Sequence, residues 1–460
     1  MLFETDWLAS EPVFYNTLSG LASTDINDVI DLANLEFSRE GLACFLEFGF
    51  CAFGLTPVRD VAYLPPSSRL LRSPEGRLEV ESLPDGLEQR LSDGRSEDEV
   101  IDLLRSKVAR LEESAVGDIV IPTSGGYDSR LLNLVVGDRT RVRAFTYGTS
   151  SRQSESIEVT RARELSRRLG VRWEQIPLGL FHIYFDDWDH LFGPAVHAHG
   201  MYQMEFLNEV NRRVGAGRVL LSGLAGDWFS GKGDPLARPV ACPSDVPNLI
   251  MRLGLHADAR MSHWGPPSLA YESYYEQHRE VLRSHRRRLV EMVRFRLMLL
   301  HYLLKLPRHL GFEVVAPFTD IDVAAAIMSL PDERRVDRRW VREYFEERGA
   351  ALDEVSGSGQ NSLNYQGMRL VPLPALDEQL LREIVRSDYV RWVNRHTRRT
   401  GEWAEFYTWL AHRKGFRRAI GRAKGIGLWP RRRLEAYGAY LTLRPLESLL
   451  KRRDMARATN

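Results

Sequence analysis

The sequence has little of what marks several large classes of protein. Its three cysteines, Cys44, Cys51 and Cys242, have neither a paired nor a zinc-binding spacing, which argues against a disulfide scaffold or a structural zinc module. No apolar run is long enough to span a bilayer, and no basic and apolar leader opens the chain, so we expect a cytoplasmic protein. A formal net charge of +1 does not favour a dedicated nucleic-acid binder.

What the sequence does contain is typical of a globular protein. Its 460 residues are 43% hydrophobic and 27% charged, which is enough for a sizeable core. The charge is uneven, because residues 411–460 hold 14 Lys or Arg and three acidic residues. We expect a helical, basic tail from about residue 377, most simply a solvated face. Contact with an anionic membrane surface, a phosphorylated glycan carrier or RNA is the alternative.

Short apolar runs alternate with helical patterns in the middle of the chain. We expect strands at 118–123, 142–146, 171–176 and 219–221, and a short extended segment at 312–315. The spacing of apolar residues predicts helices at 97–111, from a cap at Ser154 to a stop at Gly170, at 201–214, at 288–304 and within 320–350. Such alternation predicts an α/β fold with a doubly wound parallel sheet.

The flanking regions carry weaker signals. Residues 1–95 are predicted to form a small β-rich domain with one helix near Asn27–Leu35. The region 231–280 is predicted to be irregular, and the loop 356–362 to be polar and flexible. We therefore expect three units: residues 1–95, a nucleotide-binding unit over 96–375, and a basic helical region over 376–460.

The most informative stretch is Ser124–Ser129, which reads SGGYDS and lies between an expected strand and an expected helix. A glycine-rich turn at a helix N-terminus leaves backbone N–H groups available for phosphate oxygens. Asp128 repels phosphate unless a divalent cation bridges the two, so its presence indicates Mg²⁺. No Gly-Lys-Ser/Thr ending follows, which excludes a Walker A loop. Taken alone, the six residues are explained equally well as an ordinary capped turn.

Two later stretches repeat this pattern. Ser222–Asp227 (SGLAGD) follows the fourth strand, and Gly311–Asp320 (GFEVVAPFTD) contains the extended segment. Asp227 can hold a cation together with Asp128, which would bridge the phosphates and stabilise departing pyrophosphate. Ligands of such sheets bind outside the carboxyl ends of the strands, so we expect the first two stretches to lie together there. A glycine turn with a capping Asp remains the alternative for Ser222–Asp227, and a buried strand entering a capped helix for Gly311–Asp320.

In this order, the three stretches resemble the synthetase domain of the asparagine synthetase family, whose first stretch is the pyrophosphate loop of the N-type ATP pyrophosphatases. The resemblance covers about residues 97–367. It implies a fold like that of the adenine nucleotide alpha hydrolases, with ATP and Mg²⁺ as cofactors. The residues that it places on the nucleotide are Ser124, Gly125, Gly126, Asp128, Ser129, Tyr147, Ser222 and Gly223. It places Mg²⁺ on Asp128 and Asp227, and it makes Asp128, Asp227 and Asp320 the catalytic set.

The resemblance also implies a reaction. Such a ligase activates a carboxylate as an acyl-adenylate, releases pyrophosphate, and passes the acyl group to an amine or ammonia. We expect a small-molecule or glycan carboxylate as substrate, and no nucleic acid as partner. The alternatives are another adenylating enzyme of the same group, such as a tRNA-modifying one, and a catalytically silent nucleotide-binding or scaffold protein. The sequence leaves the oligomeric state open.

The sequence departs from the family pattern on the acceptor side. Leu224 and Trp228 stand where asparagine-forming members carry Glu. Arg130 replaces a small hydroxyl residue after the first stretch, and the loop 358–362 lacks the family's Lys. The ATP half of the pattern is kept while the acceptor half is changed, so asparagine itself is not the expected product.

The N-terminal region departs from the pattern in the same way. Leu2 stands where glutamine-dependent members carry their nucleophilic Cys, although residues 48–68 resemble the end of the family's amidotransferase domain. We interpret residues 1–95 as a reduced remnant without glutaminase activity. The nitrogen would then come from a substrate amine, free ammonia or a separate glutaminase.

Overall fold

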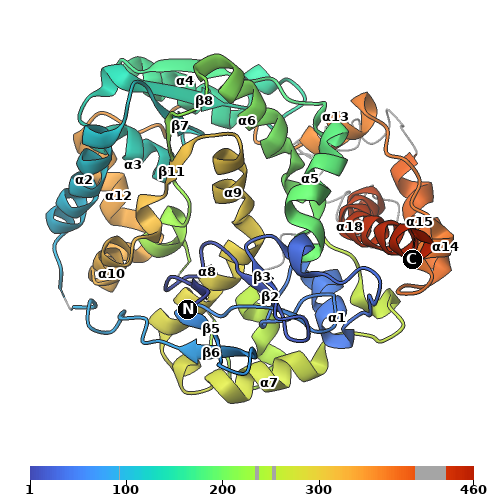
Figure 1. Ribbon diagram of the computed structural model, residues 1–460. Coiled ribbons are helices and arrows are strands. Elements are labelled where there is room, and N and C mark those ends of the chain that lie inside the picture. The colour runs from blue at the N-terminus through green and yellow to red at the C-terminus, as the bar shows by residue number, and fades with distance from the viewer. Residues whose placement is uncertain (93, 234–237, 251–254, 399–430, 460) are drawn as a thin grey trace.

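The computed structural model describes residues 1–92, 94–233, 238–250, 255–398 and 431–459. Figure 1 shows the central sheet and its helices in the upper part of the view, the N-terminal strands below them, and the C-terminal helix α18 (Arg431–Thr459) to one side. One hydrophobic core cluster runs through all three parts, from Trp7 to Leu450. The three predicted units thus share a core, and their limits at residues 95 and 375 stay predictions.

A five-stranded parallel sheet organises the middle of the chain. Its strands are β7 (Ile119–Pro122), β8 (Val142–Thr146), β9 (Arg172–Gln175), β10 (Val219–Leu221) and β11 (Glu313–Val315). They lie in the order β11-β10-β7-β8-β9, and every neighbouring pair is parallel. The predicted doubly wound α/β fold is confirmed, and each strand lies inside its predicted range.

The order of the strands reverses at β7. The chain moves outward from β7 through β8 to β9, and then returns to the other side of β7 to form β10 and the edge strand β11. Ile119 and Val120 pair with Val219 and Leu220, so the loops that follow β7 and β10 leave the sheet side by side. In open α/β sheets a ligand crevice forms at such a point, outside the carboxyl ends of the strands.

Helices form around the sheet where apolar residues recur with a helical period. They are α2 (Glu97–Ser114), α3 (Tyr127–Val135), α4 (Ile157–Leu169), α5 (Phe185–Phe192) and α6 (Met201–Val214). Gly170, with a φ of 68°, ends α4 in the left-handed conformation, as predicted. The predicted cap at Ser154 is wrong, because that residue lies in a 3₁₀ turn and Ser156 is the N-cap residue of α4.

The segment after β10 is more helical than the sequence predicted. The predicted helix at 288–304 is divided at His301 into α8 (His285–Leu300) and α9 (Tyr302–His309). The region 231–280 contains a regular helix, α7 (Ser268–His278), which its Pro and Trp residues had obscured. The helices that follow β11 are α10 (Ile321–Met328), α11 (Asp332–Arg335), α12 (Arg339–Glu347) and α13 (Leu363–Leu370).

The N-terminal region is rich in strands, as predicted. Its two small antiparallel sheets contain β1 (Phe3–Glu4), β2 (Phe14–Asn16), β3 (Ala22–Ser23), β4 (Val61–Tyr63), β5 (Ser68–Arg72) and β6 (Leu78–Ser82). The predicted helix at Asn27–Leu35 is wrong: Ile26–Val29 forms only a 3₁₀ turn, and the helix is α1 (Arg39–Phe48). Most of α1 is buried, including Leu42, Phe45 and Leu46.

The C-terminal region is helical, as predicted, and consists of α14 (Glu378–Leu381), α15 (Ser387–Arg398) and α18. The interpretation of the tail as a solvated face is wrong for α18, which packs against α1, α14 and α15 and buries Tyr437 and Leu446. Its Arg444 and Lys451 both bind Glu447, which is fully buried. Residues 411–430 of the basic tail lie outside the described residues. No helix in the described ranges is long and apolar enough to cross a membrane.

Candidate functional site

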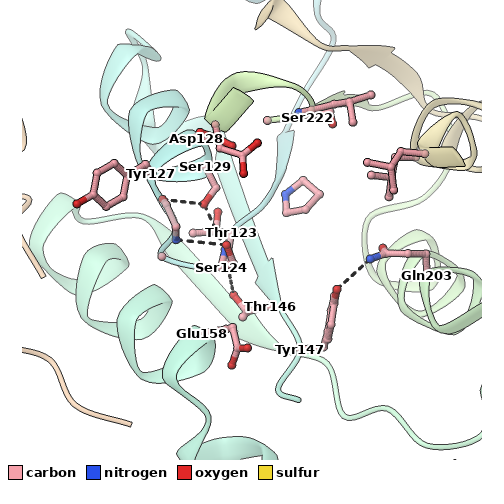
Figure 2. Close-up of a pocket in the computed structure, with 18 of the residues that line it drawn as sticks. Thr123, Ser124, Tyr127, Asp128, Ser129, Thr146, Tyr147, Glu158, Gln203 and Ser222 are labelled. Atoms are coloured by element: carbon pink, nitrogen blue, oxygen red, sulfur yellow. Dashed lines mark hydrogen bonds between the residues drawn. The ribbon is translucent and has the colours of Figure 1, made fainter. Parts of the chain in front are cut away.

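A cavity of about 690 Å³ opens where the strand order reverses. Its walls come from the loops after β7, β8 and β10, from α4 and α6, and from the junction of α8 and α9. The predicted nucleotide and metal residues that line it are Ser124, Gly125, Gly126, Asp128, Ser129, Tyr147, Ser222, Gly223 and Asp227. Figure 2 shows Asp128 and Ser222 at the top of the view, Tyr147 and Gln203 at the lower right, and Ser124 between them. The structure brings all the predicted nucleotide and metal residues to one cavity.

The loop that begins at Ser124 lines this cavity and leads into the N-terminus of α3. Gly125 has a φ of 67°, and a Cβ atom there would lie 2.4 Å from Cβ of Arg161, so the position requires glycine. Gly126 is the N-cap residue of α3 and makes no side-chain capping bond. The Gly126 N–H donates to Oγ of Ser124 at 3.2 Å, and the Ser124 N–H donates to Oγ of Ser129 at 3.3 Å. The loop therefore lies at the positive end of a helix and carries two serine hydroxyls, which suits a phosphate group.

Asp128 and Asp227 come from the loops after two neighbouring strands. The second loop passes directly against Asp128, because a Cβ atom at Gly226 would lie 2.9 Å from the carboxyl carbon of Asp128. A Cβ atom at Gly223 would lie 3.0 Å from Cβ of the same residue. Burial, and next the negative charge of Asp227, raise the pKa of Asp128 above its ordinary value. Two carboxylates therefore share a poorly solvated corner of the cavity.

This carboxylate pair suits a hard divalent cation that arrives with a nucleotide. Mg²⁺ prefers oxygen ligands and is commonly held by one or two carboxylates together with substrate phosphates. Throughout the described residues, no group of three or more His, Cys, Asp or Glu side chains converges to hold a metal. A cation beside Asp128 and Asp227 would offset their mutual repulsion and favour the charged form of Asp128. The two residues therefore fit Mg²⁺ bound jointly by protein and phosphate.

The end of the cavity after β8 has an aromatic wall with polar edges. The hydroxyl oxygen of Tyr147 accepts a hydrogen bond from Nε2 of Gln203 at 2.9 Å. The Tyr147 ring packs edge-on against Phe206, with 5.1 Å between the ring centroids. Nearby, the Thr149 hydroxyl donates to Glu158 at 2.9 Å. An apolar surface with hydrogen-bonding groups at its rim suits a flat heteroaromatic group.

The structure adds three basic residues that sequence reasoning missed: Arg161, Lys232 and Arg338 line the cavity. Nζ of Lys232 lies 2.6 Å from Oδ2 of Asp227. The guanidinium carbon of Arg338 lies 3.8 Å from the centre of the Tyr127 ring. The place of Lys232, shortly after the second stretch, was a usable signal in the sequence. Arg338 belongs to an arginine-rich run in which nothing distinguishes it from its neighbours.

Asp320 does not line the cavity, although the sequence suggested a place near the active site. Its Oδ1 accepts hydrogen bonds from the backbone N–H groups of Asp322 at 3.0 Å and Val323 at 3.3 Å, which caps α10. Its Oδ2 forms an ion pair with Lys107 of α2. Both oxygens therefore serve the packing of α10 against α2.

The sequence matches the model of a known family. A family model described as asparagine synthase matches residues 99–348, which is more than half of the chain. None of the curated proteins matches the sequence. A solved structure of the NH₃-dependent NAD synthetase from Campylobacter jejuni subsp. jejuni, in complex with a nitrate ion, matches with 13% identity and a TM-score of 0.22. That match covers 29% of this chain and 59% of the other, so the chain spans less than two thirds of that protein.

Proposed function

Because the chain belongs to the asparagine synthase family, we propose that it is an ATP-dependent ligase that joins a carboxylate to an amine or to ammonia. The observation that carries this proposal is the convergence of two carboxylates and a glycine loop at the reversal of the strand order. Asp128 and Asp227 would hold Mg²⁺, and the loop Ser124–Ser129 would hold the phosphates. Tyr147, Ser222 and Gly223 would contact the rest of the nucleotide.

The proposed reaction has two steps. A carboxylate oxygen of the substrate bonds to the α-phosphorus of ATP, and pyrophosphate leaves with the electrons of the broken P–O bond. The nitrogen of the amine then attacks the acyl carbon and loses a proton, and AMP leaves. The chain acts by holding the reactants and by offsetting the charge of pyrophosphate with the loop N–H groups, Lys232 and Arg338. Bound Mg²⁺ supplies further charge neutralisation at Asp128 and Asp227.

The nitrogen would not come from a glutaminase within residues 1–95. The two cysteines of that region, Cys44 and Cys51, are fully buried, and burial raises the pKa of both thiols. A thiol acts as a nucleophile through its thiolate, which burial suppresses here. Leu2, at the position of the family's nucleophile, is paired to the sheet by a bond from its N–H to the Leu70 carbonyl at 2.8 Å. A substrate amine, ammonia or a separate glutaminase remains as the source.

The acid would differ from aspartate. Leu224 and Trp228, which stand where asparagine-forming members carry Glu, both line the cavity. The Trp228 ring lies under the guanidinium group of Arg296, with 4.3 Å between the guanidinium carbon and the ring centre. An ammonium group of an amino-acid substrate would have no acidic partner at either position. We therefore expect aspartate to be a poor substrate.

The test is Mg²⁺- and ATP-dependent release of pyrophosphate across a panel of carboxylic acids, with AMP measured in the same reactions. We expect release with a subset of the acids and equal amounts of AMP once an amine is added. Release of ADP and phosphate would overturn the acyl-adenylate chemistry. ATP binding without turnover of any acid would favour the silent nucleotide-binding alternative.

A further inference from the structure

Arg130 is a buried cation directly behind the phosphate loop. It stands where the family pattern has a small hydroxyl residue, and its side chain is 3% exposed. Its Nη2 donates to the Gly125 carbonyl at 2.7 Å, and its Nη1 donates to the Ala350 carbonyl at 3.2 Å. The guanidinium carbon lies 4.6 Å from the centre of the Phe345 ring. Its direct contacts among the described residues are these carbonyls and aromatic rings, while the charge of Asp353 acts on it without a direct ion pair.

A buried charge with no carboxylate in direct contact is costly, so its surroundings matter. Burial lowers the pKa of Arg130 to about 10, which still leaves the group charged near neutral pH. A charged donor makes a stronger hydrogen bond to a carbonyl than a neutral one does. The Gly125 carbonyl is therefore held firmly toward Arg130 and away from the cavity.

Because the peptide unit is planar, fixing the Gly125 carbonyl also fixes the direction of the Gly126 N–H on the other side of the loop. In a trans peptide the carbonyl of one residue and the N–H of the next point in opposite directions. A Gly125 carbonyl fixed toward Arg130 therefore aims the Gly126 N–H away from it, to the side where Oγ of Ser124 lies at 3.2 Å. Gly125 and Gly126 line the cavity, whereas Arg130 does not.

The same guanidinium group connects the loop with α12. Phe345 belongs to α12 and Ala350 follows it, while Arg338, the residue just before α12, reaches the cavity. The Tyr127 ring lies between the two arginines, 5.3 Å from the guanidinium carbon of Arg130 and 3.8 Å from that of Arg338. The phosphate loop and the basic residue opposite it are thereby held by one scaffold.

We propose that Arg130 is a positioning residue for the ATP phosphates, which fixes the Gly125–Gly126 peptide of the loop that would hold them and keeps this loop in register with Arg338. This rests on the proposed function, since it assumes that the cavity binds ATP. Arg130 contacts no nucleotide itself. Its effect is confined to the phosphate end, because the wall around Tyr147 is built from other elements.

The test compares ATP and adenosine binding to Arg130→Met, which keeps most of the side-chain volume and loses the charge and the bonds. Calorimetry with MgATP and with adenosine reports the phosphate end and the base end separately. We expect MgATP binding to weaken about tenfold or more, as for a misplaced binding group, and adenosine binding to change less than about twofold. Arg130→Lys keeps the charge and reaches one carbonyl at most, so it should restore part of the MgATP affinity.

A matched control is Arg288→Met. Arg288 is also buried and also donates to two backbone carbonyls, those of Leu282 and Arg283, at 2.8 Å each, but it lies outside the cavity. Arg288→Met should lower the melting temperature as Arg130→Met does and leave MgATP binding unchanged.

Three results would overturn the inference: wild-type MgATP affinity in Arg130→Met, an equal loss for adenosine, or an equal loss in Arg288→Met. If Arg130→Met does not fold, Arg130→Lys decides by the same comparison. Failure of the wild-type protein to bind MgATP would instead overturn the proposed function.

Discussion

Asp128 and Asp320 each follow a strand of the parallel sheet and stand at the start of a helix, yet their surroundings differ. The carboxylate of Asp128 faces a cavity, has Asp227 beside it, and has its pKa raised. The carboxylate of Asp320 caps α10 and pairs with Lys107. The carboxylate of Asp128 can therefore bind a ligand, whereas the hydrogen bonds and the ion pair of Asp320 stabilise the fold.

The two strands also differ in their places in the sheet. Asp128 follows β7, the central strand, next to which the strand order reverses. Asp320 follows β11, which lies at the edge and has β10 as its one neighbour in the sheet. A strand, a turn and an aspartate are thus insufficient for a site: β11 also lies next to β10, yet the carboxylate of Asp320 is taken up by the N-terminus of α10 and by Lys107. Substitutions at the two aspartates and in their loops should therefore affect catalysis and stability differently.

The largest effect is expected for Asp128→Asn. Removing one of two cation ligands beside the phosphates should lower the turnover of pyrophosphate release by about a hundredfold or more. The fold should be kept, since the substitution removes a poorly solvated charge. Steady-state kinetics with circular dichroism on the same sample checks both parts. Turnover close to wild type would show that the site lies elsewhere.

The next effect is expected for Gly125→Ala, with Gly311→Ala as its counterpart in the third stretch. Both glycines have positive φ, 67° and 86°, so alanine strains both by about 1–2 kcal/mol. A Cβ atom at position 125 would also meet Arg161 at 2.4 Å. We expect Gly125→Ala to raise the KM for ATP about tenfold or more and Gly311→Ala to lower only the stability. Equal kinetics in the two variants would remove the contrast between the stretches.

A smaller effect is expected for Asp320→Ala. The loss of a helix cap lowers the free energy of unfolding by about 0.5–2 kcal/mol, and the lost bond to Lys107 adds to it. Turnover at a temperature where the variant is folded should stay within about twofold of wild type, since the side chain lies outside the cavity. Urea unfolding and the pyrophosphate assay measure the two quantities. A hundredfold loss of turnover in the folded variant would return Asp320 to the catalytic set.

The smallest effect is a pH dependence of stability in the absence of nucleotide. The pKa of Asp128 is higher in the folded than in the unfolded chain, so the folded state binds the proton more tightly. Its contribution to stability is therefore present at low pH and is lost as the pH rises above about 4. Asp128→Asn lacks this loss, so its stability relative to wild type should increase with pH, by about 1 kcal/mol at most because the side chain is only partly buried. A constant difference across pH would contradict the raised pKa.

Local patterns sufficed for the sheet and for most of the candidate site. The strands are short apolar runs bounded by glycine and serine. The glycine, serine and aspartate residues of Ser124–Ser129 and Ser222–Asp227 mark these two stretches as candidate binding loops. Their meeting could be anticipated because parallel strands share one carboxyl edge. That Asp320 lies apart could not be read from the sequence, because strand order and the partner Lys107 are tertiary facts.

The sequence-based predictions fail where contacts between distant parts of the chain determine the structure. The basic residues of α18 suggested a solvent-facing tail, but its arginines reach acids that lie elsewhere in the chain, such as Glu383 for Arg453. The sequence shows Arg130 only as a departure from the family pattern. Its structural role depends on the Ala350 carbonyl, which lies far along the chain and could not be identified as its partner from the sequence.

The buried place of α18 also has a consequence for synthesis in the cell. The surfaces of α1 and of the turn Ala198–Gly200 that it covers leave the ribosome well over two hundred residues before α18 does. At a translation rate of about 5–20 residues per second, those apolar surfaces stay exposed for roughly ten seconds to a minute before α18 is synthesised. During that interval chaperones are needed to cover the exposed apolar surface of the nascent chain. A chain whose translation stops before α18 keeps this surface exposed and is therefore prone to aggregate.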